Sequence, residues 1–67
     1  MIAVQSSNLA GVAYDGRTLV IAFHGGGIYA YYSVPYSKYA GLMRADSHGK
    51  YFHAHIKGHY SYRKISR

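Results

Sequence analysis

Two tyrosines two positions apart are the residues of this sequence best suited to bind a ligand. Tyr29 and Tyr31 lie in the run Gly-Ile-Tyr-Ala-Tyr-Tyr-Ser-Val-Pro, residues 27–35. Successive side chains of a strand point to opposite faces, so both phenol rings share one face of the strand predicted there. Such rings can stack nucleobases while nearby cations neutralise phosphate. Tyrosine also packs well inside a sheet protein, and the sequence alone leaves both roles open.

The charged residues are strongly biased towards cations. Eight Lys and Arg stand against two acids, Asp15 and Asp46, which gives a formal net charge of +6. Such an excess favours polyanionic partners, namely nucleic acid, nucleotides or an anionic membrane surface. Only Arg17 lies in the first half, and the second half carries the others: Lys38, Arg44, Lys50, Lys57, Arg63, Lys64 and Arg67. We therefore predict that the C-terminal half faces the ligand.

The length and composition indicate one small domain spanning residues 1–67. A chain of 67 residues, 49% of them hydrophobic, buries about 60% of its unfolded surface and is only marginally stable. It has no cysteine, so neither disulfides nor a thiolate metal site can add stability. Association into a homo-oligomer is the simplest remaining source.

Three strands are predicted in the N-terminal half. Residues 9–14 and 18–23 form the first two, joined at Asp15-Gly16, a dipeptide that suits a turn with positive φ. The core face of the second strand carries Leu19, Ile21 and Phe23. Residues 25–27 are all glycine and precede β-rich residues 28–34, which favours a hairpin turn over a phosphate-binding loop.

Two helices are predicted after Pro35. Tyrosine, alanine and methionine recur at helical spacing over residues 36–45, and a second helix follows a cap at Asp46 or Ser47 and stops at Gly58. Residues 59–67 are expected to form a basic tail. The predicted fold class is α+β: a three-stranded antiparallel meander, followed by two helices packed on one sheet face.

The order of motifs along the chain resembles the KTSC domain family. The resemblance rests on Ser6-Ser7-Asn8-Leu9, Tyr14-Asp15, Leu19, Phe23, Tyr29-Ala30-Tyr31, Val34-Pro35, Tyr39, Leu42, Ser47, Gly49, Tyr51-Phe52, Ile56 and Tyr60. That family is named after a domain at the C-terminus of some lysyl-tRNA synthetases, and it also occurs as small stand-alone proteins of bacteria and phages. The association with a synthetase implies RNA binding. The phage-borne relatives imply an alternative, a sponge for signalling nucleotides.

The sequence departs from the family pattern at two positions. His53 stands where the family more often has Asn after Tyr-Phe, and Ala13 stands where it more often has Gly before Tyr-Asp. If that Asn contacts the base of a ligand in the family, base recognition differs in this chain.

Neither catalysis nor metal binding is expected. Acid–base chemistry needs positioned carboxylates or an oriented His, and Asp15 falls in a turn while Asp46 and Ser47 are explained as helix caps. The histidines are five: His24, His48, His53, His55 and His59. Their spacing brings no tetrahedral ligand set to one helix face, and we predict no cofactor.

The predicted ligand contacts combine polar, aromatic and basic side chains: Ser6, Asn8, Tyr29, Tyr31, Lys50, His53, Lys57, Arg63 and Lys64. Simpler roles remain open, because residues 6–8 can be a polar turn and the basic pair near the C-terminus a solvated tail. Four histidines interleave with the lysines of the C-terminal half, so anion affinity should rise below a pH of about 6.5. Unchanged binding between about pH 8 and pH 6 would contradict this hypothesis.

These observations predict a non-catalytic protein that binds nucleotide-containing anions, with RNA as the first choice. The alternative is a phage-type oligomer that sequesters a small cyclic nucleotide signal and so blocks host anti-phage defence. A third possibility is a protein-interaction module. No apolar run approaches the roughly 18 residues of a membrane span, and residues 1–15 lack the features of a signal peptide. We therefore expect a cytoplasmic protein of a bacterial cell, encoded by the host or by a phage, with no membrane partner.

Overall fold

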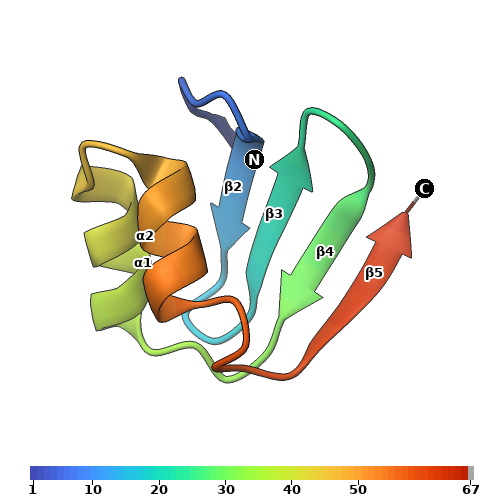
Figure 1. Ribbon diagram of the computed structural model, residues 1–67. Coiled ribbons are helices and arrows are strands. Elements are labelled where there is room, and N and C mark those ends of the chain that lie inside the picture. The colour runs from blue at the N-terminus through green and yellow to red at the C-terminus, as the bar shows by residue number, and fades with distance from the viewer. Residues whose placement is uncertain (67) are drawn as a thin grey trace.

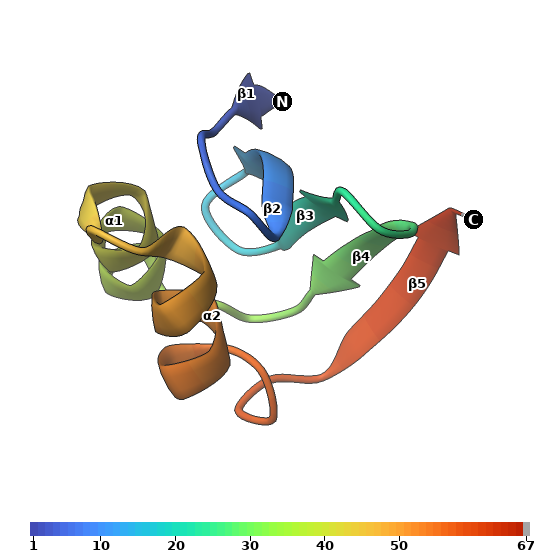
Figure 2. The same cartoon turned by 45° about the horizontal axis from the view of Figure 1, so that its top comes forward.

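The computed structural model describes residues 1–66 and shows a five-stranded antiparallel sheet with two helices on one of its sides (Figure 1). The strands are β1 (Ile2–Ala3), β2 (Leu9–Tyr14), β3 (Leu19–Phe23), β4 (Ile28–Tyr31) and β5 (Tyr62–Ser66). The helices are α1 (Tyr36–Arg44) and α2 (His48–His55). A view turned by 45° shows that β4 and β5 curve away from the helices, which stand together beside β2 (Figure 2).

The α+β class is confirmed, but the prediction of three strands is wrong. The sheet order is β1-β2-β3-β4-β5, so one strand is added at each edge of the predicted meander. β1 pairs antiparallel with β2, and β5 pairs antiparallel with β4, Tyr62 lying opposite Tyr31. All five residues of β5 are exposed, so this strand has no alternation of buried and polar residues that a sequence pattern could reveal. β5 is recognised as a strand by its backbone pairing with β4.

The predicted turns at Asp15-Gly16 and at residues 25–27 are both present, and hydrogen bonds from backbone N–H groups stabilise them. The Asp15 carboxylate accepts hydrogen bonds from the backbone N–H groups of Arg17 at 2.9 Å and Thr18 at 2.7 Å. These bonds hold the pKa of Asp15 below its usual value. Gly27 has a φ of +73°, and its carbonyl accepts from the Phe23 N–H at 3.2 Å. The glycine run is therefore a hairpin turn that leads into a strand, as predicted.

The two helices begin and end close to the predicted positions. α1 follows Pro35, and α2 is capped by Ser47, whose hydroxyl accepts the Lys50 N–H at 3.2 Å. Gly58 has a φ of +83°, the left-handed conformation expected just beyond a helix end. A Cβ at Gly41 of α1 would overlap the ring of Tyr51 in α2, so this glycine allows the two helices to approach.

The core lies between the helices and the facing side of the sheet. Its largest fully buried side chains are Leu9, Leu19, Ile21, Leu42, Ile56, Val12 and Val34. Leu19 and Ile21 are buried as predicted, and Phe23 packs against their cluster while remaining half-buried. The core thus extends beneath Phe23, where the side chains of the candidate site begin.

Candidate functional site

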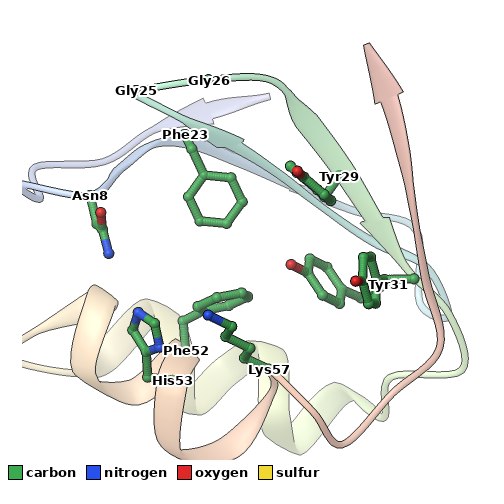
Figure 3. A pocket seen from close by; sticks show the side chains of 10 residues that line it. Asn8, Phe23, Gly25, Gly26, Tyr29, Tyr31, Phe52, His53 and Lys57 are labelled. Atoms are coloured by element: carbon green, nitrogen blue, oxygen red, sulfur yellow. The ribbon is translucent and has the colours of Figure 1, made fainter. Parts of the chain in front are cut away.

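A pocket of about 440 Å³ lies between α2 and the side of the sheet that faces the helices (Figure 3). It is lined by Asn8, Phe23, Gly25, Gly26, Tyr29, Tyr31, Phe52, His53, Lys57 and Tyr62. In the close view, Phe23 projects from the sheet towards Phe52, and Asn8 and His53 lie on the same side of the space between them. Its size is within the range of small-molecule sites in proteins.

Tyr29 and Tyr31 share one face of β4 as predicted, but that face looks towards the helices. In the sheet register Tyr29 lies opposite Ile21 and Tyr31 opposite Leu19, so the two rings stand on the same side as core residues. Tyr31 is 5% exposed and Tyr29 is half-buried. Tyr31 therefore does not form the open stacking platform that the sequence suggested. Both rings form part of the pocket wall instead.

Five aromatic rings build this wall, and we call them the pocket cluster: Phe23, Tyr29, Tyr31, Phe52 and Tyr62. Phe23 meets Tyr29 at 5.7 Å and Phe52 at 5.4 Å between ring centroids, both edge to face. Tyr31 meets Phe52 edge to face at 5.4 Å and Tyr62 at 5.7 Å. Edge-to-face contacts stabilise neighbouring rings and hold them at an angle. Tyr31 and Phe52 are almost fully buried, so the ring surface open to a flat ligand is that of the half-buried Phe23 and Tyr29 and the exposed Tyr62.

The surroundings of the pocket cluster are positively charged. Lys57 and His53 line the pocket, and the Lys64 ammonium lies 6.0 Å from the centroid of the Tyr29 ring. Neither acid of the chain, Asp15 or Asp46, is among the lining residues. An anion that enters therefore meets cations without meeting a carboxylate.

A second pocket of about 590 Å³ adjoins the first and shares Asn8 and His53 with it. Its remaining lining residues are polar or small: Ser7, Ser47, Gly49, Lys50 and Ala54. The two pockets therefore differ in chemistry. The first is aromatic, whereas the second is polar and carries the cation of Lys50 at its edge.

Ser6 is placed in the turn that precedes β2 and lines neither pocket. Its hydroxyl accepts the backbone N–H groups of Asn8 at 3.1 Å and Leu9 at 3.2 Å. His24 reinforces this turn, because its backbone N–H donates to the Asn8 carbonyl at 3.0 Å and its Nε2 lies 3.1 Å from the Ser6 carbonyl oxygen. Ser6 therefore holds the loop that presents Asn8, the polar-turn role that the sequence left open.

Arg63 and Lys64, predicted together as phosphate contacts, lie on opposite faces of the sheet. Lys64 is opposite Tyr29 in the register and shares its side, whereas Arg63 is opposite Ala30 and points away from the pocket. The segment predicted as a basic tail thus places one of its two central cations at the pocket and the other on the far face. Arg67, counted with the basic C-terminal half, lies outside the described residues.

The predicted site residues that line one of the two pockets are Asn8, Tyr29, Tyr31, Lys50, His53 and Lys57. Phe23 was predicted only as a core residue, Phe52 entered only through the family resemblance, and Tyr62 was predicted only as part of the basic tail. Tyr62 and Lys64 are two residues apart, the spacing that places two side chains on one face of a strand, but the residues of β5 show no alternation that indicates a strand. The inward direction of Phe23 follows from its alternation with Leu19 and Ile21, whereas the pocket-lining role of both phenylalanines had no sequence signal.

The histidines are dispersed in the structure. His48 Nδ1 lies 2.8 Å from the Leu42 carbonyl oxygen, and His59 Nε2 lies 3.1 Å from that of Ala54. Across residues 1–66, no three His, Asp or Glu side chains come together as a metal ion would require. Over the same residues, neither helix is long and apolar enough to cross a bilayer.

Comparison with known proteins identifies relatives over nearly the whole chain. The sequence profile of the KTSC domain matches residues 5–60. A lysine–tRNA ligase of Nostoc sp. (strain PCC 7120) is 42% identical over 50 residues, which are 75% of this chain and 9% of the ligase. The similarity is to the C-terminal region of such ligases. The chain thus spans less than a tenth of that relative's length.

Two further relatives match from end to end. An uncharacterized protein of Stutzerimonas stutzeri (strain A1501) is 37% identical over 67 residues, with 96% of this chain and 94% of that protein covered. The crystal structure of a KTSC domain protein from Yersinia pestis superposes with a TM-score of 0.91 at 38% identity, covering 94% of this chain and 92% of that one. The five-stranded sheet with two helices is thus an arrangement that this relative shares.

Proposed function

The chain belongs to the KTSC domain family, and on that premise we propose that it is a non-catalytic protein that binds nucleotide-containing anions, with RNA as its principal ligand. The pocket cluster carries the proposal, because five aromatic rings meet there beside cations and without an acid. Base–aromatic stacking and phosphate neutralisation are the two contacts that single-stranded nucleic acid needs. A core made only for stability would not require an aromatic recess open to solvent.

The recessed position of the rings changes the mode of binding from that expected for an open platform. One unpaired base enters the pocket and stacks on the ring faces, while its flanking phosphates lie near Lys57, Lys64 and Lys50. RNA-binding proteins commonly recognise unstacked bases of loops and ends in this way. Paired RNA would present no free base, so the proposal is specific for single-stranded or looped RNA.

The relatives support RNA over other polyanions. Similar segments form the C-terminal region of lysine–tRNA ligases, and the name of these relatives says that they act on a tRNA. A small basic domain appended to such an enzyme would bind the same class of polymer. This is support by association, and the pocket chemistry provides the physical reason.

A second candidate is capture of a small nucleotide, and the concave shape of the pocket favours it. A recess of about 440 Å³ walled by sheet and helix suits one nucleotide better than a long strand. In that case the phosphates would belong to the same small molecule, and an oligomer could enclose it between copies. Interaction with a protein partner is the third possibility, and it uses neither the cations nor the recess. The experiment below distinguishes it from the other two.

The deciding experiment measures the affinity of the purified protein for single-stranded RNA oligonucleotides, mononucleotides and cyclic dinucleotides by isothermal calorimetry. RNA affinity that falls steeply with salt supports the first candidate, because phosphate contacts release counterions. Tight, salt-tolerant binding of a small nucleotide, with no binding of RNA, supports the second. If none of these ligands binds, the nucleotide proposal fails and a protein partner becomes the leading hypothesis.

Adjacent lysine and arginine residues on opposite faces provide the matched control. Lys64→Ala removes a cation beside Tyr29, whereas Arg63→Ala removes the same charge from the far face. The slope of log affinity against log salt should fall by about 0.7 for Lys64→Ala and stay unchanged for Arg63→Ala. Equal slopes in the two variants would mean that net charge, and not the pocket, attracts RNA.

A further inference from the structure

Tyr31 carries the most buried polar side chain of the pocket, and the fold itself does not use its hydroxyl group. Tyr31 is 5% exposed, yet across residues 1–66 its hydroxyl has no hydrogen-bond partner. The same oxygen is not sealed from solvent, because no fully covered side-chain oxygen or nitrogen lacks a partner in this part of the chain. Since Tyr31 lines the pocket, the space that its hydroxyl reaches is the pocket itself.

Tyr14 shows what a structural tyrosine does in this same protein. Its hydroxyl donates to the Val34 carbonyl at 2.6 Å, a bond within the fold. Buried tyrosine hydroxyls usually find such a partner, since a buried polar group without one costs stability. Tyr31 is more buried than Tyr14 and lacks this bond, so its hydroxyl is left for water or for a ligand.

The Tyr31 ring is held firmly by its neighbours. Phe52 meets it edge to face at 5.4 Å, and Tyr62, its partner across β4 and β5, lies at 5.7 Å. Burial, helped by the nearby phenols of Tyr29 and Tyr62, raises the pKa of Tyr31 to about 12. The hydroxyl therefore keeps its proton at physiological pH, and a fixed ring holds the donor oxygen in a fixed place.

No side chain that lines the pocket can only accept hydrogen bonds. Lys57 only donates, Asn8, His53 and the tyrosine hydroxyls can do both, and no carboxylate lines the space, so the acceptor-only groups are backbone carbonyls such as those of Gly25 and Gly26. The lining side chains therefore favour a ligand edge that supplies acceptors. Among nucleobases, a carbonyl group on the ring is the most prominent acceptor, and adenine has none.

We propose that Tyr31 Oη is the specificity-determining hydrogen-bond donor of the pocket, and that it selects bases with an exocyclic carbonyl, such as guanine, hypoxanthine or uracil, over bases without one. This inference rests on the proposed function, because it names the base that the same pocket accepts. It assigns Tyr31 a role distinct from ring stacking, since only the hydroxyl and not the ring makes the selection.

The test combines deletion of the donor with deletion of the acceptor. The probes are inosine 5′-monophosphate and purine riboside 5′-monophosphate, which differ at the base by the six-carbonyl group, titrated at matched salt and followed by NMR. Wild-type protein should bind the inosine probe about three- to tenfold more tightly, as expected for one net hydrogen bond. Tyr31→Phe should remove this preference by weakening only the inosine probe.

Tyr29→Phe is the matched control, because it deletes a hydroxyl from the same strand face two residues earlier. Tyr29→Phe should retain the preference for the inosine probe.

Tyr31→Phe should also keep the wild-type melting temperature, since it removes a hydroxyl that has no partner within residues 1–66. Equal affinity of wild-type protein for both probes, or a preference that survives in Tyr31→Phe, would overturn the inference alone. If wild-type protein bound neither probe but still bound single-stranded RNA, the inference would fail and the proposed function would stand; if it bound neither the probes nor RNA, both would fail.

Discussion

Within residues 1–66, contacts among tyrosine and phenylalanine rings form two clusters of three or more rings, and one of them is suited to a ligand. The pocket cluster surrounds an open recess beside Lys57 and Lys64. The other, which we call the closed cluster, consists of Tyr14, Tyr36 and Tyr39, with the rings of Tyr14 and Tyr39 stacked at 4.5 Å. In the closed cluster Tyr14 and Tyr39 cover one face of each other, and Tyr36 is tilted against both.

Charge and hydrogen bonding separate the two clusters further. The closed cluster lies next to the acid Asp15, and the Tyr14 hydroxyl is engaged with Val34. Burial, followed by the charge of Asp15, raises the pKa of Tyr14, so this hydroxyl also stays protonated, but its proton is already committed to the fold. Tyrosine content alone therefore does not make a binding site in this chain. An open ring face, an unused hydroxyl and nearby cations must coincide.

The largest expected effect comes from Phe52, which belongs both to the core and to the pocket cluster. Phe52 is 3% exposed, and Phe52→Ala should lower the free energy of unfolding by about 3–5 kcal/mol through lost burial and the cavity left behind. Urea denaturation measures this loss. Phe52→Leu, which keeps an apolar side chain in place, should lose less. A loss below about 1 kcal/mol for Phe52→Ala would show that the pocket cluster is not part of the core.

The next effect compares one exposed tyrosine from each cluster. Tyr62 is 62% exposed and Tyr36 is 67% exposed, so replacing either by alanine should cost little stability. Tyr62→Ala should weaken RNA binding by about 1–3 kcal/mol, the contribution of a ring that stacks a base. Tyr36→Ala should leave RNA affinity unchanged. If both variants bound RNA equally well, the distinction between the clusters would not hold.

Two phenylalanine substitutions sharpen the difference between the hydroxyl groups. Tyr14→Phe breaks the bond to the Val34 carbonyl and should cost about 1 kcal/mol of stability. Tyr31→Phe should change stability by less than about 0.5 kcal/mol, because its hydroxyl has no bond to lose within residues 1–66. Thermal denaturation of the two variants side by side tests this. A larger loss for Tyr31→Phe than for Tyr14→Phe would mean that the Tyr31 hydroxyl is bonded within the fold.

The last effect is absent at neutral pH and appears only as a change of stability in alkali. The pKa of Tyr31 is about 12 in the folded chain against 10.0 for the unperturbed phenol. As the pH rises from 10 towards 12, the unfolded state loses this proton before the folded state does, so folding stability falls over that range. Tyr31→Phe should flatten this fall. Absorbance titration at alkaline pH, which detects phenolate directly, should show one late-titrating group fewer in the variant.

Much of the local structure could be predicted because it depends on neighbours in the chain. The turn at Asp15, the glycine hairpin and the cap at Ser47 each follow from side-chain and backbone bonds over a few residues. The core face of β3 follows from its alternation of apolar residues. Six of the nine predicted contact residues line a pocket. Periodicity accounts for the shared strand face of Tyr29 and Tyr31 and for Lys50 and His53, three apart on α2, whereas Asn8 and Lys57 lie outside the strands and helices.

The sequence by itself determined the excess of positive charge, the membership in an α+β class and the shared face of Tyr29 and Tyr31. Only the tertiary structure decided which way that face points. The addition of β5 beside β4 brought Tyr62 and Lys64 to the pocket and turned Arg63 away from it. The packing of α2 supplied Phe52 and His53 from the opposite side, and the turn after α2 supplied Lys57. These contacts join residues far apart in the sequence, and no local periodicity encodes such a pairing.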